Sequence, residues 1–193
     1  MNDHLLAGVT DACLSAHAEV MAAEGLVLTP RLVVVRDGQL IGYVTLRPVY
    51  VGKDAVDAVG QMSHLAAAAE ADEVFAVWET QDLAAACDHV PLHPDTALNV
   101  VHANPDKHVL YRHPYREWRL PGRTSSGMAK AKPQWLSPHP PAPEAELEPA
   151  IAGMLHFCWE PFDTGSKIRV EAAAAYLIEQ RYTVQLTAPA SEA

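Results

Sequence analysis

The chain has 193 residues, of which 49% are hydrophobic and 20% are charged, which is enough apolar material for one sizeable core. Its formal charge of −10 argues against non-specific binding of the whole chain to nucleic acid or to an anionic membrane. No apolar run approaches the roughly 18 to 20 residues of a membrane span, and the N-terminus lacks the basic start of a secretory signal. The three well-separated cysteines fit neither a disulfide framework nor a zinc knuckle, so we expect a cytoplasmic protein without membrane contact.

The first 120 residues carry the hydrophobic periodicities of a layered α/β domain. The clearest local signal is Asp37-Gly38, a two-residue type I′ turn pattern between two β-rich runs. In chain order we expect a helix over 3–24, strands over 32–35 and 39–46, a helix over 54–71, a strand over 73–79, a helix over 80–86, and strands over 97–103 and 108–113. The order α-ββ-α-β-α-ββ predicts a layered mixed sheet of about five strands, with the strand 73–79 near its centre and covered on both faces.

The remaining residues divide into three segments. Residues 121–149 contain seven prolines and are expected to form a linker or an arm on the surface, followed by a C-terminal helix from about Lys167 to Arg181. Residues 150–187 are too few for an independent core, so they should dock onto the first domain or onto a second copy of the chain. Residues 188–193 are expected to be a disordered tail.

One short segment resembles a metal site in composition. Cys87, His89 and His93 offer three ligands within seven residues, and His102 could join them from the predicted strand pair. The spacing of Cys87 and His89 differs from that of usual zinc sites, and a buried cysteine followed by an exposed loop explains the pattern equally well. We expect no cofactor, with zinc or magnesium as the alternative.

The end of the predicted central strand is the candidate catalytic position. Ligands of layered α/β proteins bind beyond the carboxyl ends of such strands, where Glu79 and Asp82 could serve acid–base chemistry or hold magnesium. The competing explanation is that Thr80 and Asp82 begin the next helix, with Thr80 as its cap and Asp82 in a first turn where an acidic side chain is favourable.

A basic, aromatic stretch follows the predicted domain core. Residues 107–132 hold seven Lys and Arg against one acidic residue, Glu117. Arginine and aromatic residues are enriched at binding hot spots and can also stack on nucleic-acid bases, although the overall charge disfavours nucleic acid. Alternatively, these arginines only neutralise nearby carboxylates. The candidate binding residues are Arg112, Tyr115, Arg116, Trp118 and Arg119.

Motifs for nucleotide binding or for nucleophilic catalysis are absent from the sequence. The sequence therefore favours a non-catalytic cytoplasmic binding or assembly protein, whose basic aromatic arm engages a protein partner or a second subunit. The alternative is a divalent-metal-dependent hydrolase or nuclease that uses Glu79, Asp82 and nearby histidines. Convergence of Glu79 with His89, His93 or His102 would favour that alternative.

Overall fold

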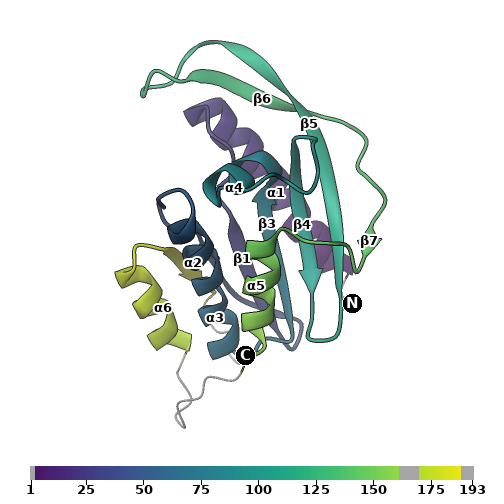
Figure 1. Cartoon of the computed structure of the whole chain (residues 1–193), viewed down its shortest axis with the longest axis vertical. Coiled ribbons are helices and arrows are strands. Elements are labelled where there is room, and N and C mark those ends of the chain that lie inside the picture. The colour runs from purple at the N-terminus through teal and green to yellow at the C-terminus, as the bar shows by residue number, and fades with distance from the viewer. Residues whose placement is uncertain (1–2, 161–169, 188–193) are drawn as a thin grey trace, which may run out of the picture.

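The structure is a computed structural model that describes residues 3–160 and 170–187, and it shows a mixed α/β protein as predicted (Figure 1). The tail expected over 188–193 and the start of the expected C-terminal helix lie outside the described residues. The elements are α1 (Asp3–Glu24), β1 (Arg31–Arg36), β2 (Gln39–Thr45), α2 (Lys53–Gln61), α3 (Ser63–Ala68), β3 (Glu73–Glu79), α4 (Thr80–Ala86), β4 (Ala97–Ala103), β5 (His108–Arg123), β6 (Ala129–Trp135), β7 (Ala142–Pro143), α5 (Pro149–Cys158), α6 (Val170–Glu179) and β8 (Thr183–Leu186).

The described strands form one eight-stranded sheet, in the order β6-β5-β4-β3-β1-β2-β8, with β7 paired to β5 beside this path. Every pairing is antiparallel. The prediction of about five strands in a mixed sheet is therefore wrong, although β3 does lie at the middle of the strand order. The extra strands β6 and β7 come from the Pro-rich segment and β8 comes from the C-terminal segment, and they pair with β5, β5 and β2 respectively.

The sheet separates two apolar layers because successive side chains of a strand point to opposite faces. On β3, Val74 and Ala76 face the layer of α2, α3 and α5, whereas Phe75 and Val77 face α1. Figure 1 shows α1 on one side of the sheet and the other long helices across from it. The nearly continuous burial of β3 thus follows from helices on both of its faces.

Local signals account for the first hairpin. Asp37 and Gly38 have φ angles of 51° and 70°, the left-handed values of a type I′ turn, and they join β1 to β2. The helix expected over 54–71 is instead two helices, α2 and α3, which meet at Met62.

The C-terminal segment packs onto the same chain. Helix α5 contributes Ile151 and Met154 to the core that α2 and α3 share, and β8 pairs with the free edge of β2. The hydroxyl of Tyr182 donates a 2.8 Å hydrogen bond to the carbonyl oxygen of Ala58 in α2. No described helix has both the length and the apolar character needed to cross a membrane.

Docking of β8 depends on a glycine. A Cβ at Gly42 would overlap the backbone carbonyl oxygen of Gln185, so Gly42→Ala should separate β8 from β2. We expect faster amide hydrogen exchange at residues 183–186 and a loss of about 1 to 3 kcal/mol in unfolding free energy. Gly8→Ala is the control, because a Cβ at Gly8 meets no atom within 4 Å, and it should stabilise α1 by up to about 1 kcal/mol. Unchanged exchange in β8 would contradict this docking.

Candidate functional site

Glu79 ends β3 and begins α4. It is buried, and its Oε2 accepts a 2.7 Å hydrogen bond from the backbone N–H of Asp82, so its carboxylate is the N-cap of the helix. Burial raises the pKa of Glu79, as it does that of Asp82. The other carboxylate oxygen of Glu79 has no hydrogen-bond partner among the described residues. A helix does begin at this point of the chain as expected, but its cap is Glu79 and not Thr80, and a catalytic role for Glu79 stays a prediction.

The four candidate metal ligands occupy two places. Cys87 is buried at the end of α4, and His89 lies 3.6 Å from Glu148 through its Nδ1 atom. On β4, Leu98 pairs with Glu79, and His102 lies four residues further along the same strand. The Nε2 atom of His102 instead lies 2.9 Å from Glu73, at the other end of β3. Across the described ranges, no three His, Cys, Asp or Glu side chains are grouped so that they could hold a metal ion. The zinc and magnesium hypotheses stay predictions.

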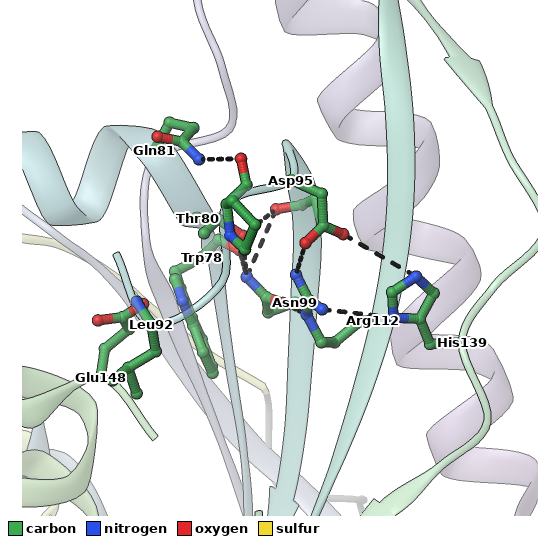
Figure 2. Close-up of polar contacts among 11 residues, drawn as sticks. Trp78, Thr80, Gln81, Leu92, Asp95, Asn99, Arg112, His139 and Glu148 are labelled. Carbon is green, nitrogen blue, oxygen red and sulfur yellow. Dashed lines mark hydrogen bonds and ion pairs between the residues drawn. The ribbon is translucent and has the colours of Figure 1, made fainter. Parts of the chain in front are cut away.

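Arg112 is the centre of a polar network near the start of β4 and within the first half of β5 (Figure 2). Only 7% of this residue is exposed, so its guanidinium needs partners inside the protein. Its Nη2 donates to Asp95 at 2.7 Å, and its Nε donates to Asn99 at 3.3 Å. Its Nη1 donates to Nδ1 of His139 at 3.3 Å. Arg112 therefore belongs to the interior and not to an exposed binding surface.

The network connects segments that are far apart in the sequence. Asn99 donates to the hydroxyl of Thr80 at 2.9 Å, which links β4 to the start of α4. The backbone N–H of His139 donates to the carbonyl oxygen of Arg112 at 3.1 Å, which holds the Pro-rich segment against β5. Burial alone would raise the pKa of Asp95, but the hydrogen bond and charge of Arg112 outweigh it and lower that pKa.

Sequence reasoning missed Asn99 and His139 of this network. A signal was present for Asn99, because this polar residue interrupts the apolar run ALNVV, and a buried amide needs a partner. The structure places Asn99 directly opposite Arg112 in the β4–β5 register.

Beyond this network, β5 leaves the central sheet and forms a hairpin with β6. Figure 1 shows the two strands running past the other elements of the sheet. Tyr115 marks the base of this hairpin, since it is buried under α1 and pairs with Trp135 of β6. Its ring contacts His17 in an edge-on arrangement with centroids 4.8 Å apart, and it contacts Trp135 at 5.4 Å. Tyr115 thus anchors the hairpin and is not part of its exposed surface.

The end of α1 also fits the hairpin closely. Gly25 follows α1 with a φ of 70°, and a Cβ there would meet the carbonyl oxygen of Ala129 at 2.5 Å. Met21, Tyr115 and Ala131 form a small buried cluster at this contact. The base of the hairpin is therefore packed against a helix, which limits its motion relative to the body.

Strand alternation divides the side chains of the hairpin between two faces. Tyr115 points toward α1, so Arg116 and Trp118, at the first and third positions after it, point to the opposite face. Across the strands, Arg116 pairs with Gln134 and Trp118 pairs with Lys132. We call Arg116, Trp118, Lys132 and Gln134 the hairpin face; all four are exposed, and Trp118 is 58% exposed. Arg119 is also exposed, on the α1 side of the hairpin.

The burial of Arg112 generates a prediction. Arg112→Met should lower the unfolding free energy by about 3 kcal/mol, because it leaves the Asp95 carboxylate without its cation and removes the donor to the Asn99 side-chain oxygen. Arg116→Met, on the same face of the same strand but exposed, is the matched control and should change stability by less than about 0.5 kcal/mol. Urea denaturation of both variants gives the comparison, and equal effects would contradict a special role for Arg112.

The buried histidine at the hairpin base generates a second prediction. His17 is fully buried, and burial lowers its pKa from 6.5 to about 4. Between pH 6.5 and about 4, His17 binds a proton in the unfolded chain but not in the folded chain. The unfolding free energy therefore decreases as the pH falls from 6.5 to about 4. One histidine with this shift accounts for about 3 kcal/mol.

The measurement is the unfolding free energy from pH 7 to pH 4. His17→Asn keeps an acceptor for the backbone N–H of Leu28 but cannot titrate, so its pH dependence should be weaker than that of the wild type. His4→Asn, at an exposed position of α1, should follow the wild-type curve. A His17→Asn curve parallel to the wild type would overturn this assignment.

No protein-family description, no curated protein and no solved structure matches the chain.

Proposed function

We propose that this chain is a cytoplasmic binding protein that engages an acidic protein surface through the hairpin face. The observation that carries the proposal is the exposure of Trp118, an indole held between basic side chains on a hairpin whose base is buried. Tryptophan and arginine are the residue types most enriched at binding hot spots. The three cysteines are buried and unpaired, which supports a reducing compartment.

Charge supports an acidic partner. Residues 107–132 hold seven Lys and Arg against one acid, so the rest of the chain holds seven against twenty-three. A long polyanion such as nucleic acid would be attracted by the hairpin but repelled by the remainder of the molecule. A folded protein with a local acidic patch can contact the hairpin alone, which favours a protein partner.

The face of the hairpin, and not its edge, is suited to this contact. The outer edge of β6 is the end of the sheet, where unpaired backbone groups could add another strand. Lys130, Lys132 and Pro133 lie on this strand, and lysine and proline are the residues that discourage such pairing. Side chains of the hairpin face remain available for recognition.

The buried residues at the base support binding through rigidity. A loop that must become ordered on binding loses affinity through its conformational entropy. Arg112 and Tyr115, which the sequence placed among the binding residues, hold the hairpin in position from inside the protein. We therefore assign them a positioning role, and we assign contact to Arg116 and Trp118 of the hairpin face, but not to Arg119, which lies on the α1 side of the hairpin.

The proposal predicts site-specific crosslinking. An aromatic photo-crosslinking amino acid at position 118, which keeps a large ring in place of the indole, should give a covalent protein adduct in cells, whereas the same amino acid at Tyr50, which is 84% exposed elsewhere, should not. Adding Arg116→Glu and Lys132→Glu should abolish the adduct, because both changes reverse charges beside position 118. No adduct from position 118, equal adducts from both positions, or an adduct to nucleic acid would overturn the proposal.

A further inference from the structure

A groove of about 630 Å³ lies between helices α2–α3 and α5. Its apolar lining includes Val56, Met154 and Phe157, and two of these are unusually exposed for large apolar side chains, Val56 at 41% and Phe157 at 48%. A groove of this volume with an apolar lining is large enough to receive a bulky side chain from another molecule. Within the described residues, no other part of the chain covers this groove.

Two glycines keep the groove open. Gly60 in α2 and Gly153 in α5 both line it, and a Cβ at either position would meet no atom within 4 Å. Glycine weakens a helix relative to alanine, and neither glycine has a close contact within the described chain that would require it. Their absent side chains leave space that a bulky group from another molecule can enter.

The charges around the groove are opposite to those of the hairpin. Asp57 and Glu160 are among its lining residues, and no described Lys or Arg is. Each acid has a partner one helical turn away, Lys53 for Asp57 and His156 for Glu160, but these pairs are exposed and are therefore weak. A basic partner can replace such a contact at little cost.

We propose that the partner of the hairpin is a second copy of this chain, and that its hairpin face docks in this groove with the Trp118 indole beside Gly60 and Gly153. This inference rests on the proposed binding function and names its partner. An indole with two flanking basic side chains matches an apolar groove that has acidic residues in its lining. Because hairpin and groove are different surfaces, the contact is heterologous: one copy contributes the hairpin face and the other contributes the groove.

The test is the mass of the purified full-length chain as a function of concentration, measured by light scattering after size exclusion. The wild type should self-associate in the micromolar range, and self-association should weaken at high salt. Trp118→Ala removes the indole and Gly153→Leu fills the groove; each should weaken self-association about 30-fold or more, the scale of a hot-spot loss. Gly8→Leu, at an exposed helical glycine with no neighbour within 4 Å, is the control for Gly153→Leu and should associate like the wild type.

Mixing the two variants gives the decisive result. Trp118→Ala retains an intact groove and Gly153→Leu retains an intact hairpin, so an equimolar mixture should form a one-to-one complex that neither variant forms alone. Thermal unfolding of each variant shows whether it is folded. If Gly153→Leu associates like the wild type, the groove is not the docking site. If the wild type is a monomer up to about 100 µM, the partner is not a second copy; in either case the crosslinking experiment at position 118 still decides the binding function separately.

Discussion

The buried charge of Arg112 is the constraint on which the arrangement of this molecule depends. A guanidinium removed from water is stable only when its donors are used, and the structure supplies a carboxylate, an amide and an imidazole from three different segments. The loop that carries Asp95 and the Pro-rich segment that carries His139 are thereby held at the same end of the sheet (Figure 2). The chain can then pass from β6 to α5 in a defined path.

The 16-residue length of β5 makes the hairpin possible. Its first half completes the central sheet against β4, and its second half pairs with β6. Between the two halves lies Tyr115, buried with His17 and Trp135 beneath α1. The same strand therefore belongs to the core in its first half and to the projecting hairpin in its second half. Because Tyr115 between the two halves is packed under α1, the hairpin that carries the exposed indole of Trp118 is held in a fixed position.

The two surfaces that carry the functional argument arise from different physical causes. The hairpin face is exposed because a two-stranded ribbon beyond the body has a helix on one side only. The groove is open because two glycines in neighbouring helices leave volume that no described side chain fills. Basic residues exceed acidic residues in the hairpin, and acidic residues exceed basic residues in the rest of the chain. This difference makes contact between the hairpin of one copy and another copy electrostatically favourable.

By itself, the sequence determined the features that depend on neighbouring residues. The Asp37-Gly38 turn and the buried strand β3 follow from local conformation or short periods, whereas the strand expected over 108–113 continues as β5 to Arg123. Helix capping by Glu79 was also open to local reasoning, since an acidic side chain at a helix start has a partner within one turn.

Only the tertiary structure decided which of the basic and aromatic residues are buried. Arg112 and Tyr115 resemble Arg116 and Trp118 in type and spacing, but Arg112 has Asp95 and Asn99 beside it and Tyr115 has α1 above it. The strand β8 likewise pairs with the free edge of β2, which is far away in the chain, whereas β6 pairs with β5, the strand directly before it. Long-range contacts set burial and pairing here, because the partners that satisfy a buried charge or an open edge are far away in the chain.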